Sequence, residues 1–359
     1  MEERHRGADV GLMVLHFIVR EGQRCGDPDA AASRARVTAC ERLIAHYSDH
    51  PDMDACLSCF RGGVWIPQAE MLMRDMAEHS SHSHVRAAAW YYLARWLKQK
   101  SELPRIREKL RAHLEFAPEH QKAWQIRRLE SYGLFGDIHS EQVRQEAIAA
   151  ARYMQQHFPD ERHPARSFSG PAYILLTRDD TCPQQDVFSE KAENLIFEIE
   201  HLSIGSTAPE ITGTDADGVN FHLSDYRGRV VVLMFSANWC GPCKGMYPDN
   251  RKLVDTLADD AIDTVQQAHE DGEITWRVWW DGACGPIQTR WNINSWPSIF
   301  VIDHRGAIRD KDLRGEKLDS AVVKLLQERA ADPDADALLE AHPIPDIPTH
   351  ERARGAEGD

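Results

Sequence analysis

Two cysteines separated by two residues carry the clearest chemical signal in this 359-residue chain. Cys240 and Cys243 lie in the run WCGPCK, residues 239–244, directly after an apolar and β-branched run at 230–236. Such a run predicts a strand buried on both faces of a sheet, followed by a helix that begins near Gly241. The unpaired N–H groups and the positive dipole end of that helix stabilise a thiolate, so we expect Cys240 to have a lowered pKa and to act as the nucleophile. Cys243, one turn later, can attack a mixed disulfide at Cys240 and so serve as the resolving thiol.

A C-x-x-C pair alone also fits half of a zinc site or two buried structural thiols. The sequence around this pair favours the redox interpretation. Pro248 lies where it would kink the helix that carries the thiols. Residues 295–303, SWPSIFVID, predict a loop that ends in X-Pro and leads into an apolar strand.

These segments together resemble the thioredoxin fold: WCGPCK, the helix proline, and WPSIFVID followed by the turn at 304–306. The preceding runs at 204–211 (IGSTAPEI) and 217–228 (DGVNFHLSDYRG) are similar to the TlpA-like and AhpC/TSA-like (redoxin) branch. The resemblance covers residues 203 to 329. It implies thiol-disulfide oxidoreductase activity through the WCGPC dithiol.

The resemblance also implies a site on the loop before the second apolar strand. Trp296-Pro297 is expected to be a cis peptide beside the reactive thiol, where the backbone of Trp296 pairs with a substrate chain in β fashion. Trp239 and Trp296 then flank the sulfur and offer apolar contact to a peptide or a small thiol. The expected site comprises catalytic Cys240 and Cys243 and substrate-binding Trp239, Gly241, Pro242, Trp296 and Pro297.

We expect no cofactor and no metal beyond the redox-active Cys240–Cys243 disulfide. The expected partners are protein or small-molecule disulfides and thiols, together with an upstream reductase. One departure concerns proton transfer, because thioredoxins carry a buried acid six residues before the first cysteine and Met234 stands there. Cys243 is therefore left without an internal base, and water or another group must serve.

Two alternative functions remain open on the sequence. Peroxidatic cysteines of the AhpC/TSA branch follow a P-x-x-x-[ST]-x-x-C pattern, whereas Leu233 and Ala237 occupy the Pro and Ser/Thr positions here. A thiol peroxidase is therefore the first alternative. The second is a helical-repeat interaction scaffold with a weakened redox domain.

A second departure concerns the sheet. Between Pro248 and a strand expected at 274–280, residues 249–273 keep helical spacing and contain no β-branched run of four. We therefore expect the redox domain to lack one parallel strand. Two short strands are expected earlier, at 210–214 and 219–223, joined by a turn.

Chain length, net charge and hydropathy limit the number of domains and the kinds of partner and location that the sequence allows. A chain of 359 residues predicts two domains, and a formal net charge of −15 without a long basic run argues against a nucleic-acid partner. No window reaches the length of a transmembrane helix. The apolar run at 10–19 is short and lacks a cleavage site, so we interpret it as a helix rather than an export signal. The sequence leaves the location open: the lack of a visible export signal favours the cytoplasm, whereas relatives of this type commonly work outside it.

The predicted fold class is α+β multidomain: an N-terminal all-α helical-hairpin array, then an α/β thioredoxin-like fold that lacks one strand. Helical spacing of apolar residues dominates the first part of the chain. His46, His79, His113 and His157 each lie near the end of a helical run, and the first three are 33 and 34 residues apart. We expect these histidines to favour the negative ends of helices. The predicted boundaries are a helical domain at 1–160, a connector with a linking helix at 161–202, the redox domain at 203–329, and an acidic, Pro-containing disordered tail at 330–359.

The remaining cysteines are too scattered for a disulfide scaffold, and we expect them to be reduced and mostly buried. They are Cys25, Cys40, Cys56, Cys59, Cys182 and Cys284. Cys56 and Cys59 could be combined with His79, His82 and His84 into a zinc site, but the spacing favours a helical pair facing the core. Cys284 lies in the loop at 281–286, where an ordinary loop cysteine is more plausible than a third redox thiol.

Overall fold

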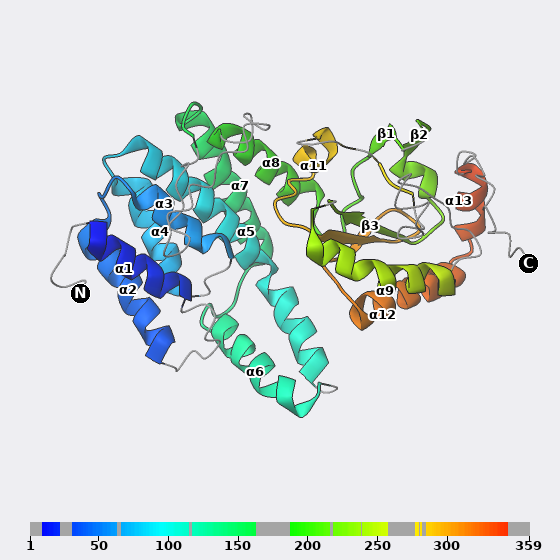
Figure 1. Ribbon diagram of the computed structural model, residues 1–359, viewed down its shortest axis with the longest axis horizontal. Coiled ribbons are helices and arrows are strands. Elements are labelled where there is room, and N and C mark those ends of the chain that lie inside the picture. The colour runs from blue at the N-terminus through cyan, green and yellow to red at the C-terminus, as the bar shows by residue number, and fades with distance from the viewer. Residues whose placement is uncertain are drawn as a thin grey trace, which may run out of the picture. The chain divides into compact units, whose positions relative to one another are not determined.

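The structure is a computed structural model that describes residues 9–21, 31–62, 66–114, 117–162, 187–215, 218–237, 239–257, 277–279, 281 and 285–343. The chain divides into two compact units, Met1–Ile199 and Glu200–Asp359. Figure 1 shows the helical first unit and the second unit, which contains the strands.

Helices make up the described part of the first unit. They are α1 (Asp9–Glu21), α2 (Ala31–Tyr47), α3 (Met53–Leu57), the 3₁₀ helix η3 (Ser58–Gly62), α4 (Pro67–His79), α5 (Ser83–Leu114), α6 (Glu119–Gly133), α7 (Ser140–His157) and α8 (Phe188–His201). The central helix α5 packs against α3, α4, α6, α7 and η3. Its apolar stripe contributes fully buried Leu93 and Leu97 and nearly buried Trp96 to the core.

The ends of these helices confirm the expectation for three of the four histidines, His46, His79 and His157. His46, His79 and His157 lie in the last turns of α2, α4 and α7. The ring nitrogen Nδ1 of His79 lies 3.1 Å from Asp75 O, and that of His157 lies 2.9 Å from Tyr153 O. Because a carbonyl oxygen can only accept, each ring donates to the carbonyl one turn earlier, at the negative end of its own helix.

The N-terminal run is also helical, as predicted. It forms α1, which buries Leu12, Leu15 and Val19 against the rest of the unit. Among the described residues, no helix is long and apolar enough to cross a membrane.

The second unit contains two separate antiparallel sheets in its described part. A hairpin joins β1 (Thr212–Thr214) to β2 (Asn220–His222), and a larger sheet has the order β3 (Val231–Phe235), β4 (Ser298–Ile302), β5 (Ile308–Lys311). The helical elements are η5 (Leu223–Tyr226), α9 (Gly241–Leu257), α11 (Pro286–Arg290), α12 (Glu316–Ala330) and α13 (Ala335–Ala341).

The larger sheet has side chains packed on both faces. One face carries Ile299 and Val301, which pack with Leu318, Val322 and Leu325 of α12. On the other face, Phe300 lies in edge contact with Phe235 and with buried Trp291. The sheet is therefore a layer covered on both faces, and the chain that leaves its strand β3 carries the two cysteines.

Two predictions for this unit differ from the structure, and a third is not tested by it. In β3 only Leu233 is buried and its neighbours are half-buried, because β4 is its only strand partner in the described chain. Residues 277–279, expected in a strand, have no strand assignment; 274–276 and 280 lie outside the described residues. Residues 249–257 belong to α9, as their helical spacing predicts, but 258–273 also lie outside, so the missing strand stays a prediction.

The acidic C-terminal stretch differs from the predicted disordered tail. It contains helix α13, whose residue Ala335 is buried. The backbone of Leu339 lies against Gly228, at a distance where any added Cβ would clash, and Arg229 donates to the carbonyl of His342. Local composition predicted disorder, but contacts with the distant loop between η5 (Leu223–Tyr226) and β3 hold this stretch in place. Residues 344–359 lie outside the described part.

Candidate active site

The N-terminus of α9 carries the two cysteines. Cys240 immediately precedes the helix and Cys243 lies in its first turn, and the two are disulfide-bonded with Cα atoms 5.3 Å apart. The backbone N–H of Cys243 donates to Sγ of Cys240 over 3.1 Å. Backbone N–H groups of Cys243 and Lys244 also donate to the Cys240 carbonyl, each over 3.1 Å. The helix therefore begins near Gly241, as predicted, and directs an N–H group at the first sulfur.

The two sulfurs are shielded to different degrees. Cys240 is 3% exposed and Cys243 is 0% exposed. They form a small cluster with Tyr247, which lies one turn after Cys243 on the same face of α9. The Tyr247 hydroxyl lies 2.9 Å from Ser236 Oγ on the chain that leaves β3. Only Cys240 therefore presents surface to an approaching disulfide.

A thioether occupies the position where thioredoxins have their buried acid. Met234 packs against the cysteine cluster, and the side-chain amide of Asn250 donates to its sulfur over 3.6 Å. This arrangement supplies an amide N–H but no carboxylate at that position. The substitution of the thioredoxin acid by Met234, noted in the sequence, therefore lies next to the cysteines in the structure.

Two tryptophans lie beside the pair. Trp239 is 74% exposed, and its ring meets Trp296 edge to face with centroids 5.3 Å apart. Trp296 also packs on the cysteine cluster, and the Trp296-Pro297 peptide is cis, as the resemblance implied. Gly241 and Pro242, in the first turn of α9, are exposed. The structure thus brings all the expected site residues to one place.

The segment 277–279 supplies a wall that sequence reasoning missed. Arg277 donates to Oδ2 of Asp215 over 2.8 and 3.0 Å, and its guanidinium lies 3.9 Å from the ring centre of Phe221. Trp279 stacks on the same ring at 4.1 Å. Val278, between them, packs against the cysteine cluster. The available signal was an arginine inside an otherwise apolar run, ITWRVWW.

The thiols of the helical unit have a different environment. Cys40 and Cys56 are fully buried, and Cys59 is half-buried against the same core. Burial raises the pKa of Cys40 to about 12 and also raises the pKa of Cys56. Thiols of this kind are protonated at neutral pH and react poorly. The helical Cys pair facing the core is therefore confirmed, whereas Cys25, Cys182 and Cys284 lie outside the described residues.

The structure does not bring these cysteines together with the downstream histidines. His79 bonds to its own helix, and Nε2 of His84 lies 2.8 Å from Pro51 O. The rings of His82 and His84 contact each other at 5.6 Å.

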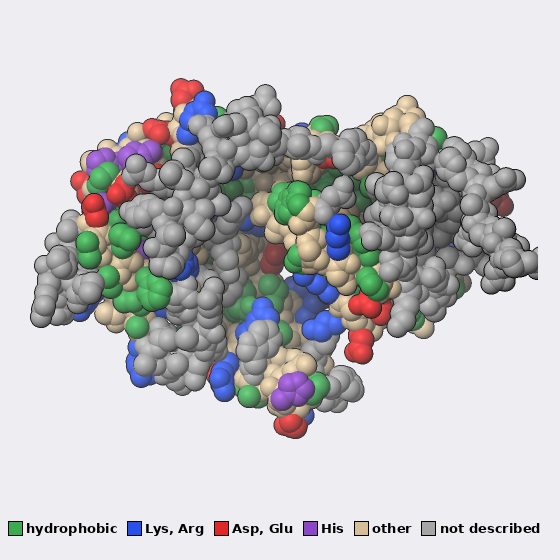
Figure 2. All heavy atoms as spheres, in the orientation of Figure 1, with side chains coloured by type: hydrophobic (Ala, Val, Ile, Leu, Met, Phe, Trp, Pro, Cys, Tyr) green, Lys and Arg blue, Asp and Glu red, His purple; other side chains and the backbone are tan. Residues whose placement is uncertain are grey.

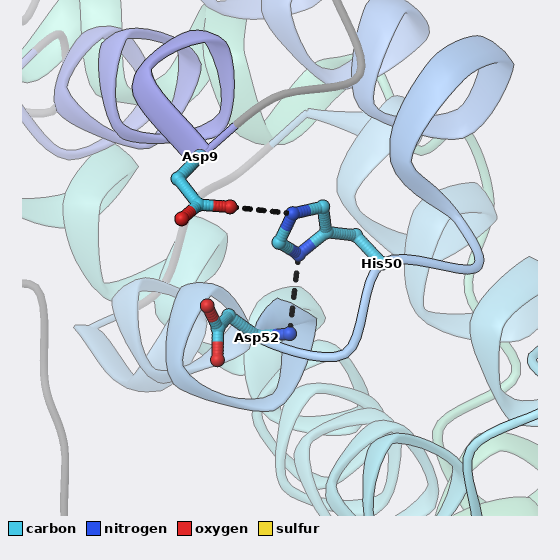
Figure 3. Close-up of side chains that lie close together, drawn as sticks. All are labelled: Asp9, His50 and Asp52. Atoms are coloured by element: carbon cyan, nitrogen blue, oxygen red, sulfur yellow. Dashed lines mark hydrogen bonds and ion pairs between the residues drawn. The ribbon is translucent and has the colours of Figure 1, made fainter.

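One cluster of potential metal ligands occurs among the described residues, at the start of α1. Asp9, His50 and Asp52 have ligand atoms within 4.8 Å of one another (Figure 3). On the face drawn in Figure 2, histidine and acidic side chains gather at this end of the helical unit. The backbone N–H of Asp52 donates to Nδ1 of His50 over 3.2 Å, so in the neutral ring Nε2 carries the proton, 3.2 Å from Asp9. A histidine that binds a metal instead donates from its second nitrogen. The cluster therefore fits a hydrogen-bonded tie between α1 and the loop before α3, and not a metal site.

Comparisons with known proteins concern the second unit. Residues 204–311 match the model of the AhpC/TSA family. The thiol-disulfide oxidoreductase ResA of Geobacillus kaustophilus is 31% identical over 127 residues, which are 32% of this chain and 72% of that protein. The thioredoxin-like protein YneN of Bacillus subtilis is 28% identical over 119 residues, 30% of this chain and 69% of its own.

Among solved structures, the thioredoxin domain of a thiol-disulfide oxidoreductase from Bacteroides vulgatus is 26% identical. The match covers 34% of this chain and 96% of that one, with a TM-score of 0.30. The identity to ResA, over most of the length of that protein, decides the assignment. The chain belongs to the AhpC/TSA family, as a TlpA-like redoxin, and is a thiol-disulfide oxidoreductase.

Proposed function

We propose that the protein exchanges disulfides through the Cys240–Cys243 dithiol, with Cys240 as the nucleophile. The observation that carries this assignment is the N–H of Cys243 directed at Cys240 Sγ over 3.1 Å. A hydrogen bond to a thiolate and the adjacent helix N-terminus both favour the charged form of the sulfur. Cys243, buried behind it, is the resolving thiol.

The exchange conserves atoms and electrons. The Cys240 thiolate attacks one sulfur of the substrate disulfide, a mixed disulfide forms, and the other substrate sulfur leaves as a thiolate that takes up a proton. The Cys243 thiol then loses its proton and attacks Cys240, so the second substrate sulfur leaves. The substrate gains two electrons and the protein keeps the Cys240–Cys243 disulfide. An upstream dithiol reductase must return those electrons for another turnover.

The residues around the two cysteines bind the substrate. Trp296 and Pro297 hold the substrate chain, while the ring of exposed Trp239 offers it an apolar surface. Gly241 and Pro242 are exposed beside the sulfur, which leaves room for the substrate. The helical unit supplies partner binding.

The test combines two assays with two substitutions. We expect wild type to reduce insulin with dithiothreitol as electron donor and to consume little hydrogen peroxide. Cys240→Ser should abolish reduction, and Cys243→Ser should accumulate a mixed disulfide with a defined peptide disulfide, detected by mass spectrometry. Cys59→Ser, which removes a half-buried thiol of the helical unit, is the matched control. Rapid peroxide consumption without insulin reduction would favour the peroxidase instead, and inactivity in both assays would favour the scaffold.

A further inference from the structure

Arg314 links the loop after β5 to the peptide expected to hold the substrate. Its Nη2 donates to the carbonyl oxygen of Pro297 over 3.2 Å. Asp312 anchors the same loop to the start of β4, because its N–H donates to Ile299 O over 2.8 Å and its Oδ1 accepts from Ile299 N–H over 3.2 Å. Arg314 is therefore held one residue away from Trp296, at the edge of the candidate active site.

Arg314 is an exposed residue, and its guanidinium has no carboxylate partner in the described part of the chain. Arg305, Arg309 and Arg329, on neighbouring elements, each pair with a carboxylate at 2.6, 2.7 and 3.4 Å. Arg314 donates to the Pro297 carbonyl, and its other N–H groups remain available to a ligand. In a chain with a formal charge of −15, Arg314 is thus an arginine without an ion pair, among the described residues, next to the Trp296-Pro297 peptide.

The chemistry of the group indicates what it can bind. A guanidinium presents N–H groups in a planar fork that matches the two oxygens of a carboxylate. Lys244, exposed directly after Cys243, puts another positive charge in the first turn of α9. The exposed ring of Trp239 offers apolar surface and no charge. A substrate suited to these groups is extended, partly apolar, and acidic close to its sulfur.

We infer that Arg314 selects peptide disulfides that carry an acidic residue next to the cysteine. The inference rests on the proposed function, since it requires the substrate chain to lie along Trp296 during exchange. Arg314 then has two contacts: one N–H holds the Pro297 carbonyl, and the free edge of the guanidinium binds the substrate carboxylate. The same contact opposes a basic residue at that position.

The experiment uses three symmetric peptide disulfides that differ only in Glu, Gln or Lys next to the cysteine. The full-length reduced protein is mixed with each, and kcat and KM are measured with dithiothreitol as electron donor. We expect kcat/KM to be about threefold to fivefold higher for the Glu peptide than for the Gln peptide, as for a solvent-exposed ion pair. The difference should lie in KM, and it should shrink in 0.5 M salt because exposed charges are screened.

Variants separate the charge of Arg314 from its contact with Pro297. Arg314→Gln should abolish the preference for Glu, and Arg314→Lys should keep part of it. Lys317→Gln, at an exposed position on α12, removes the same charge three residues away and should leave the preference unchanged.

Three outcomes would overturn the inference. Equal kcat/KM for all three peptides in the wild type refutes selection by charge, while the proposed exchange stands. An equal slowing on all peptides in Arg314→Gln would mean that Arg314 only positions the loop. If wild type reduces none of the peptides and behaves like Cys240→Ser, the proposed function itself fails and the inference falls with it.

Discussion

Cys240 and Cys243 differ in what surrounds their sulfur atoms, and the proposed order of their reactions rests on this difference. Cys240 Sγ accepts the N–H of Cys243 and retains a little exposed surface, whereas Cys243 has none. In the reduced protein we expect Cys240 to alkylate near neutral pH at least about tenfold faster than Cys243, because helix N-termini lower thiol pKa values. A short iodoacetamide pulse followed by peptide mass mapping measures the two rates. Faster labelling of Cys243 would reverse the assigned roles.

Met234 lies against the cysteine cluster, at a position from which a carboxyl group could accept the proton of Cys243, the proposed resolving thiol. Met234→Glu places a carboxyl group beside the cysteine cluster, where the Asn250 amide can hydrogen-bond it. We expect the mixed disulfide to resolve roughly tenfold faster around neutral pH, since a positioned base accelerates proton transfer. The variant should lose about 1–3 kcal/mol of stability, because a polar group enters an apolar environment.

Met234→Gln is the control for this substitution, because it has nearly the same shape and polarity but no titratable group. The measurement is the rate of thiol release from a preformed mixed disulfide, followed from pH 5 to 9. If the Gln variant accelerates resolution as much as the Glu variant, proton transfer is not the cause.

At the level of secondary structure, the β1–β2 hairpin positions part of the active-site wall. Asp215 and Arg277 form an ion pair whose side chains are 0% and 3% exposed, and they hold Val278 against the thiols. Asp215→Asn leaves the buried arginine without its charged partner, which costs about 3–5 kcal/mol in such pairs. We expect a lower urea midpoint and slower exchange together.

An exposed pair provides the comparison. Glu119 and Lys122 are 87% and 33% exposed, so Glu119→Gln should change stability by less than about 1 kcal/mol. The double variant Asp215→Leu with Arg277→Met should recover part of the stability lost in Asp215→Asn, because no unpaired charge remains buried. An Asp215→Asn midpoint equal to that of Glu119→Gln would show that the ion pair contributes little.

The edge of β3 that faces away from β4 is where the sequence predicts a strand to be absent. Within the described residues β3 pairs only with β4, and residues 249–257 are helical. We expect alternate amides of Val231–Phe235, those directed away from β4, to exchange hydrogen faster than the others. NMR hydrogen exchange on the intact protein tests this. Uniform protection along β3, or cross-strand contacts to any of residues 249–273, would show that a strand is present.

Local patterns predicted a large part of this architecture, and long-range contacts account for what they missed. The apolar spacing of α1 and α5 and the WCGPC run are local signals, so their elements and the thiol site were predictable. The contact of Arg277 with Asp215 joins residues 62 apart in the chain. The contact of Arg314 with Pro297 joins residues 17 apart. Contacts between residues so far apart leave no periodic pattern in the sequence, and neither does the packing of α13 against Gly228.

At the scale of the whole molecule, the two units contain groups that respond to acid in different pH ranges. In the helical unit, burial, with a smaller contribution from Arg20, lowers the pKa of His16 from 6.5 to about 4. In the second unit, hydrogen bonds led by that from His304 hold the pKa of Asp332 down at about 2, against 3.8 ordinarily. A buried histidine that stays neutral destabilises the folded state in mild acid, whereas a stabilised carboxylate is lost only in strong acid.

The sign for His16 follows from which state binds the proton. Between pH 6.5 and 4 the unfolded chain protonates this histidine and the folded chain does not, so the free energy of unfolding falls as the pH falls. The loss should total about 3 kcal/mol, at 1.36 kcal/mol per pH unit. Urea unfolding of the full-length protein, followed by circular dichroism of the helices at pH 7, 5.5 and 4.5, measures it. His16→Leu should remove most of this dependence, while His46→Gln, at an exposed position in the last turn of α2, should keep it. If His16→Leu loses stability between pH 7 and 4.5 as steeply as wild type, another group causes the acid sensitivity.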